Sequence, residues 1–267
     1  MIAVTSAQLD LWLASFMFPL ARILGLITMA PIFSNAAVPE RIKLITGLVV
    51  TLAIVPALPP MPAVQAGSWI GLLILTREAV IGVLLAMSLR IAFAAVDMAG
   101  QLIGLQMGLS FAVFYDPTNA SQSPVVGEFL GLLAMLIFLA LDGHLLMLAL
   151  LAQSFSLLPV SATPLAATGY AALLNWAAAL FATGLLLSLP LIAALLIANI
   201  AMGVLSRVAP QLNLFAVGFP VTIVSGFVVI GVSLPYFGAA LAHLFEQSFD
   251  AMTVIMRAGA PASVLLR

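Results

Sequence analysis

The chain is 267 residues long, 64% hydrophobic and only 6% charged, with a formal net charge of −1 and a mean hydropathy of +1.29. Soluble domains carry about 25% charged residues, so a water-facing surface cannot be built from this sequence. The small net charge excludes a basic nucleic-acid-binding surface. The absence of cysteine, with only two histidines, excludes disulfides, thiolate chemistry and a histidine-rich metal cluster.

Six apolar stretches are long enough to cross the hydrocarbon core of a membrane, which takes about 20 residues. In chain order they run over residues 9–33, 42–58, 69–108, 125–158, 165–208 and 220–249. No basic segment precedes the first stretch, so we expect a retained helix and not a cleaved signal peptide. The sequence predicts an all-α polytopic membrane protein of about six long, partly broken helices, arranged as helical hairpins in a single domain over residues 1–267.

Several of the predicted helices are too long for a simple span. The third stretch, of about 40 residues, would form a helix of roughly 60 Å, twice the thickness of the hydrocarbon core. The fourth is also overlong, and prolines lie inside the fifth at Pro190 and inside the sixth at Pro235. Proline removes a backbone donor and bends or stops a helix. We therefore expect a bundle that is not a set of upright bilayer spans.

Charged residues inside apolar helices are costly unless they are paired or face water, so each one is a functional hypothesis. At 100° per residue, Arg90 and Asp97 fall on one narrow stripe of the third helix, and Glu128 and Asp142 share a face of the fourth. Two interpretations are open: an ion or proton pathway, or ion pairs between neighbouring helices that fix their packing. We favour ion pairs, because a relay of acids would not need Arg90 on the same stripe.

A glycine repeat ends the third stretch. Gly100, Gly104 and Gly108 recur every four residues, and small residues at this spacing let helix backbones approach closely in a membrane. Packing within the chain is the ordinary role of such a repeat, so it is a weak signal by itself. Its position matters more, because it leads into the least regular segment of the sequence.

That segment, residues 109–124, mixes aromatic side chains with an Asp-Pro step and a run of Ser, Thr, Asn and Gln. Non-helical backbone at membrane depth requires burial in protein or a water-filled cavity. If the segment folds back into the bundle, Phe111, Phe114 and Tyr115 would form an apolar constriction. If it turns in water, the same aromatics would be interfacial anchors. The sequence leaves both arrangements open.

A second polar region connects the fifth and sixth stretches. Its distinctive residues are prolines, amides, one arginine, one aromatic residue and one glycine: Arg207, Pro210, Gln211, Asn213, Phe215, Gly218 and Pro220. This chemistry predicts a tight, specified connection and not a loose linker. Specified loops often contact a partner, although a rigid turn between helices is the simpler interpretation.

Nothing in the sequence predicts catalysis. The motifs GxSxG and HExxH, a P-loop and a dinucleotide-binding GxGxxG are all absent. No nucleophile is placed beside a base, and the acidic residues are dispersed along the chain. We therefore expect no enzyme activity, no catalytic residue, no metal and no cofactor.

The two polar regions resemble the signatures of a known family. The run Gly100–Ala112, followed by Asp116-Pro117, is similar to the central region of the FliR/SctT family, the export-gate proteins of flagellar and virulence type III secretion. The run Ser206–Pro220 resembles that family's other signature and is the more specific of the two. The pair Arg77-Glu78 also fits, although its place near the start of the third stretch predicts an interfacial position. The resemblance covers essentially the whole chain and tilts slightly toward the flagellar branch.

The resemblance implies a subunit of a flagellar protein export gate in the bacterial inner membrane and flagellar basal body, through which unfolded export substrates pass. FliP-like and FliQ-like subunits would join it in a helical, pore-forming hetero-oligomer, with intramembrane charges paired between subunits. The residues implied as the plug of the closed pore are Met107, Phe111, Phe114, Tyr115, Asp116 and Pro117. The loop over residues 207–220 would face the cytoplasmic entrance and contact an FlhB-like protein.

An alternative function is secondary transport of a small solute, which broken helices and charges near the midplane of the membrane would suit. A transporter of that kind predicts two halves related by an internal repeat, and the two halves of this sequence show no convincing match. Both functions place the chain in contact with membrane lipid, and neither involves nucleic acid.

Overall fold

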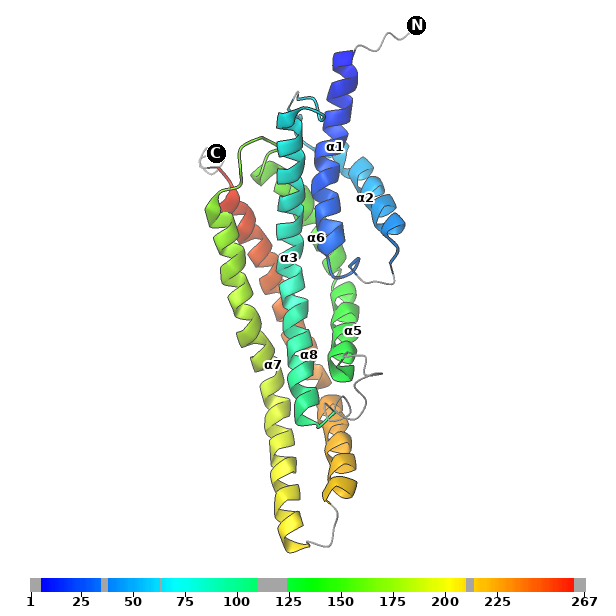
Figure 1. The fold of residues 1–267 in the computed structure, drawn as a ribbon, viewed down its shortest axis with the longest axis vertical. Coiled ribbons are helices and arrows are strands. Elements are labelled where there is room, and N and C mark those ends of the chain that lie inside the picture. The colour runs from blue at the N-terminus through cyan, green and yellow to red at the C-terminus, as the bar shows by residue number, and fades with distance from the viewer. Residues whose placement is uncertain (1–5, 35–37, 63, 110–123, 210–213, 262–267) are drawn as a thin grey trace. The chain divides into compact units, whose positions relative to one another are not determined.

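The computed structural model describes residues 6–34, 38–62, 64–109, 124–209 and 214–261, and all regular structure in these ranges is helical (Figure 1). The elements are α1 (Ser6–Met29), α2 (Glu40–Ile54), the 3-10 turn η1 (Val55–Ala57), α3 (Trp69–Gln106), α5 (Val125–Ala140), α6 (Gly143–Leu157), α7 (Ala167–Val208) and α8 (Leu214–Gly259). The predicted all-α membrane fold is confirmed. Four helices are long and apolar enough to cross a membrane, and the broken pair α5–α6 adds a fifth span if it counts as one.

Helix ends follow the chemistry of the sequence in several places. The helix α1 ends at Met29, two residues before Pro31, and η1 ends before the prolines at 59 and 60. A residue that precedes proline is pushed out of the helical conformation, which explains both stops. The third stretch, by contrast, remains one helix of 38 residues through its glycines, a length of about 57 Å.

Two stretches differ from the simplest prediction. The second holds α2, which has only 15 residues and is shorter than a full span. The fourth is overlong because it holds two helices, with Asp142 between them in the left-handed conformation at φ 54°. Glu128 and Asp142 therefore do not share one face of one continuous helix, and that prediction was wrong.

The chain divides into two compact units. Unit 1 consists of residues 1–91, 142–177 and 245–267, and unit 2 of residues 92–141 and 178–244. Each of α3, α7 and α8 contributes one part to each unit, whereas α6 belongs to unit 1 and α5 to unit 2. The expectation of a single membrane domain stays a prediction.

In unit 1, close packing of α1 against its neighbours relies on glycine. A Cβ at Gly82 of α3 would overlap the carbonyl group of Arg22, and one at Gly25 of α1 would overlap that of Ala79. On the other side, Gly47 of α2 receives the side chain of Leu24, so α2 lies along α1 (Figure 1). Small residues let backbones approach closely, and van der Waals contact then supplies the association energy.

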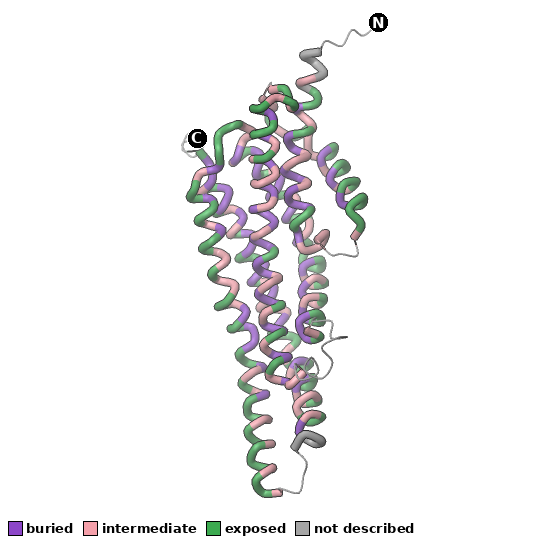
Figure 2. The backbone as a smooth tube through the Cα atoms, in the orientation of Figure 1, coloured by how far each residue is buried: buried purple, intermediate pink, exposed green. Residues whose placement is uncertain are grey.

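Figure 2 shows in green the exposed residues of the helices, and many of them are large apolar residues. In unit 2, Ile197 of α7 is 70% exposed and Val232 of α8 is 79% exposed. In unit 1, α2 turns Ile45, Val49 and Leu52 outward. Such surfaces need lipid or other protein to cover them.

Candidate functional site

The C-terminal end of α3 is closed by a Schellman motif. Gly108 has φ 79°, a left-handed conformation that glycine adopts without the strain a side chain would add. The N–H of Leu109 donates to the carbonyl of Gly104 at 3.1 Å, and the N–H of Gly108 donates to the carbonyl of Leu105 at 3.0 Å. This bond pair is the one that defines the motif. Gly108 thus lies beyond the end of α3 and caps it.

The other two glycines of the repeat face α5. Gly100 lies so close to Gly127 that a Cβ on Gly100 would overlap the Gly127 backbone, with the nitrogen 2.7 Å away. A Cβ on Gly104 would meet Val126 Cγ2 at 3.8 Å, which is an ordinary contact. The tight backbone approach between α3 and α5 therefore depends on Gly100 and not equally on all three.

Met107, just before the capping glycine, is fully buried. The hydroxyl of Thr222 on α8 lies 3.4 Å from the Met107 carbonyl, although its shorter bond is to the carbonyl of Phe219 at 3.0 Å. The amide of Asn199 on α7 donates to the carbonyl of Gln106 at 3.4 Å. Side chains from α7 and α8 therefore make long polar contacts with two of the last carbonyls of α3, which have no partner inside the helix.

The remaining residues expected in the plug, Phe111, Phe114, Tyr115, Asp116 and Pro117, lie outside the described residues. Their role as a constriction stays a prediction.

The charged stripe of α3 is exposed at Arg90 and Asp97. Arg90 Nη1 lies 3.9 Å from the sulfur of Met29, and a Cβ added to Gly131 on α5 would lie 3.6 Å from Asp97 Oδ1. Glu128, in the first turn of α5, is also exposed, and its carboxylate lies near enough to Asp97 for the two to repel. Over the described ranges, no ion pair involves these residues or Asp142. Their pairing with another subunit stays a prediction.

A buried charge cluster in unit 1 was not predicted. The guanidinium of Arg22, in the middle of α1, donates from Nε to Glu78 Oε2 at 2.7 Å and from Nη1 to Ser154 Oγ at 2.9 Å. Its Nη2 donates to the carbonyl of Leu158 at 2.7 Å, and its plane lies over the ring of Phe155, 4.1 Å from the centroid. Arg22 and Glu78 are both fully buried.

Arg77 completes this cluster. Its Nη1 donates to Glu78 Oε1 at 2.7 Å and to the carbonyl of Pro159 at 3.1 Å, so one carboxylate holds two guanidinium groups. The carboxylate is 0% exposed and the Arg77 side chain 8%, so both are held inside the protein. The interfacial position expected for this pair in the membrane stays a prediction. The signal was present in the sequence: opposite charges in separate apolar helices tend to pair with each other.

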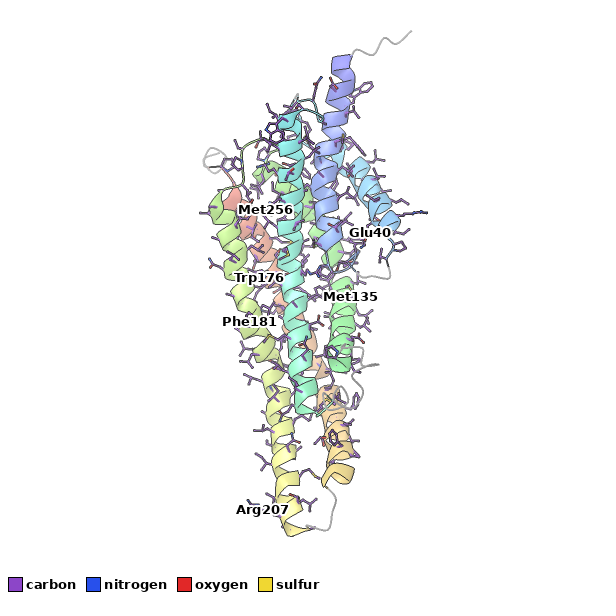
Figure 3. All side chains as sticks on the ribbon, in the orientation of Figure 1. Glu40, Met135, Trp176, Phe181, Arg207 and Met256 are labelled. Atoms are coloured by element: carbon purple, nitrogen blue, oxygen red, sulfur yellow. The ribbon has the colours of Figure 1, made fainter. Side chains whose placement is uncertain are left out.

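The predicted contact loop over residues 207–220 is described except at residues 210–213, and it is shorter than expected, because α8 already begins at Leu214. Arg207, one residue before the end of α7, is exposed (Figure 3). Residues 210–213, which include Pro210, Gln211 and Asn213, lie outside the described residues. Phe215 is in the first turn of α8, Gly218 is buried and Pro220 is exposed.

Within the described ranges, no group of three or more His, Asp or Glu side chains is arranged to hold a metal ion. The charged residues form a pairing cluster and scattered exposed sites, and the structure does not bring a nucleophile and a base together in either. The buried cluster is suited to holding helices together.

Comparisons with known proteins show which family the chain resembles. The model of the family described as bacterial export proteins, family 1, matches residues 13–248. The flagellar biosynthetic protein FliR of Pectobacterium carotovorum subsp. carotovorum is 44% identical over 260 residues, covering 96% of this chain and 98% of the other. The protein of the same name from Escherichia coli K12 is 41% identical over 256 residues, with the same coverage, and that of Bacillus subtilis is 28% identical over 246 residues.

Proposed function

The chain belongs to the bacterial export proteins, family 1, and from this premise we propose that it forms and plugs part of the pore through which unfolded flagellar substrates leave the cytoplasm. Membership of the family makes the chain a membrane component of a flagellar export apparatus, with a structural or transport role. The pore, its plug and its place in the inner membrane at the flagellar basal body are our proposal.

The observation that carries the proposal is the uncovered length of α7. This helix has 42 residues, so it is about 63 Å long, against a hydrocarbon core of about 30 Å. Lipid tails cannot cover such a helix along its whole length unless it lies nearly flat. Its far end is nevertheless apolar and exposed, with Ile200 at 60%, Val204 at 58% and Val208 at 77%.

Other protein must therefore cover part of that surface, because exposed apolar area of this size in water favours association. Subunits of similar build, the FliP-like and FliQ-like proteins, fit this requirement, since an apolar helix packs best against other apolar helices. In this proposal, Arg90, Asp97, Glu128 and Asp142 face charged residues of those subunits.

The plug would begin at Met107 and include Phe111, Phe114, Tyr115, Asp116 and Pro117. The connection from Arg207 to Pro220 would bind an FlhB-like protein at the cytoplasmic entrance. Supporting this arrangement, the sequence places an aromatic segment directly after a capped, anchored helix end.

The assembly is tested by co-expressing the tagged chain with the membrane proteins encoded beside it and measuring the intact mass by native mass spectrometry. We expect a defined hetero-oligomer of several membrane subunits. Val204→Asp should prevent this assembly, because it buries a charge at the contact, whereas Val204→Ala should retain it. A monomer that retains no partner in mild detergent would contradict the proposal and favour a transporter.

A further inference from the structure

The Met107 side chain, at the C-terminal end of α3, fills the space beside Gly226 of α8 that a side chain would otherwise occupy. A Cβ on Gly226 would lie 2.6 Å from both Cγ and Sδ of Met107, and it would overlap Cε as well. Three atoms of the methionine side chain thus occupy the space that a side chain on residue 226 would take. Met107 is fully buried as a result.

We infer that Gly226 is a positioning residue that seats Met107 and thereby fixes the end of α3, from which residues 110–123 start. This inference rests on the proposed function, in which that segment plugs the pore.

Two contacts hold the backbone of Met107. Its N–H donates to the Ile103 carbonyl at 2.9 Å, and its carbonyl lies 3.4 Å from the hydroxyl of Thr222, which it shares with the nearer carbonyl of Phe219 at 3.0 Å. Thr222 and Gly226 are four residues apart on α8, so they lie on the same face. One face of α8 therefore supplies both the space for the Met107 side chain and the hydroxyl that contacts its carbonyl.

The contact between Met107 and Gly226 matters because the chain changes direction immediately after Met107. Gly108, the next residue, has φ 79° and ends the helix. The overlap reaches back to Cγ, next to the Cβ of Met107, and Met107 is surrounded on all sides. In a close-packed interior a displaced side chain presses on its neighbours, so we expect a Cβ at residue 226 to shift this capped turn.

The end of α3 also contacts both α7 and α8, the two helices that the predicted contact loop joins. Asn199 on α7 and Thr222 on α8 each contact a terminal carbonyl of α3. Asn199 precedes Arg207 by about two helical turns, and Thr222 follows Pro220 by about half a turn. A partner that shifts these two helices would also shift the base of the segment after α3.

The first test uses the absence of cysteine from the chain. Leu109→Cys, directly after the capping glycine, then provides a single thiol while Met107 stays intact. Its labelling by a membrane-permeant maleimide is followed on the tagged chain in the assembled complex in native membranes. We expect slow labelling, because residue 109 is partly buried. Gly226→Ala should accelerate it several-fold by displacing the Met107 side chain and, with it, the capped turn.

Gly231→Ala and Gly238→Ala are matched controls on the same helix, since a Cβ at either position meets no atom of the chain within 4 Å. They should leave the labelling rate unchanged. If Gly226→Ala impairs assembly, Thr222→Val provides a second variant: it removes the hydroxyl that contacts the Met107 carbonyl and should accelerate labelling to a smaller extent. Equal labelling in Gly226→Ala and the two controls would overturn the inference.

The second test measures leakage of small ions through the closed gate in cells that carry Gly226→Ala in a chain with Met107 intact. We expect leakage to rise above that of the Gly231→Ala strain. Faster labelling without leakage would support the positioning role of Gly226 and count against the proposed plug. The two proposals can therefore be contradicted separately.

Discussion

Removing the carboxylate of Glu78 should destabilise the protein more than removing either arginine that binds it. Glu78 is fully buried and accepts one hydrogen bond from Arg22 and one from Arg77. In Glu78→Gln, two buried guanidinium groups lose their counter-charge at once. In Arg22→Met, the carboxylate keeps Arg77, and the main loss is of the donors to Ser154 and Leu158.

The expected losses of stability follow from these contacts. Breaking a buried ion pair by removing one partner costs about 3–5 kcal/mol, which we expect for Glu78→Gln. Leaving a buried acceptor without a donor costs about 1–3 kcal/mol, which we expect for Arg22→Met because Leu158 is also buried. In a chain of this size, 1 kcal/mol corresponds to about 2–4 °C in Tm, so Glu78→Gln should lower the apparent Tm by roughly 6–20 °C.

The assay is thermal unfolding of the purified protein in detergent, followed by the loss of monodisperse material in size-exclusion chromatography. Glu40→Gln is the control, because it removes an acid from an ion pair with Lys43 whose carboxylate is 76% exposed. Exposed pairs contribute about 0–1 kcal/mol, so the control should hardly change the Tm. Our reasoning about the cluster is refuted if Glu78→Gln lowers the apparent Tm no more than this control does. It is also refuted if Arg22→Met lowers the apparent Tm more than Glu78→Gln does.

Three further predictions concern α3. Gly100→Ala should lower the apparent Tm because its methyl group overlaps the Gly127 backbone, whereas Gly104→Ala has room and should not; equal effects would contradict the packing described. Gly108→Ala should cost about 1–2 kcal/mol, measured by the same unfolding assay, because a side chain strains the left-handed conformation. Asp97→Asn should leave the isolated chain as stable as the wild type but reduce its recovery in the hetero-oligomer, measured by native mass spectrometry; undiminished recovery would exclude an intersubunit ion pair.

The membrane fold was predictable because its causes are local. Stretches of apolar residues of sufficient length specify helices in lipid, where every backbone group must find its partner within the segment. Proline stops such as that after α1 follow from the geometry of a single residue. The break at Asp142 was not predictable, because Leu-Asp-Gly fits a helix as well as a turn, and the left-handed conformation is open to aspartate at modest cost.

The contacts of the candidate site were largely hidden in the sequence because they join distant segments. Arg22 and Glu78 are 56 residues apart, and only the packing of α1 on α3 brings them together. The glycines of α3 share one spacing, yet Gly100 permits a close contact and Gly108 caps the helix. Gly226 and Gly231 look equivalent in the sequence of α8, and only the position of Met107 distinguishes them.

Photo-crosslinking of a stalled export substrate tests the central proposal most directly. A photo-reactive phenylalanine analogue replaces Phe111, Phe114 or Tyr115 in the assembled gate, while a substrate fused to a tightly folded domain is held in transit. Phe181 of α7, which is 68% exposed, is the matched aromatic control (Figure 3). We predict crosslinks to the substrate from the three plug positions, none from position 181, and none when the substrate lacks the folded domain. Crosslinks absent from all three plug positions, while the substrate remains demonstrably stalled, would contradict a pore lined by this chain.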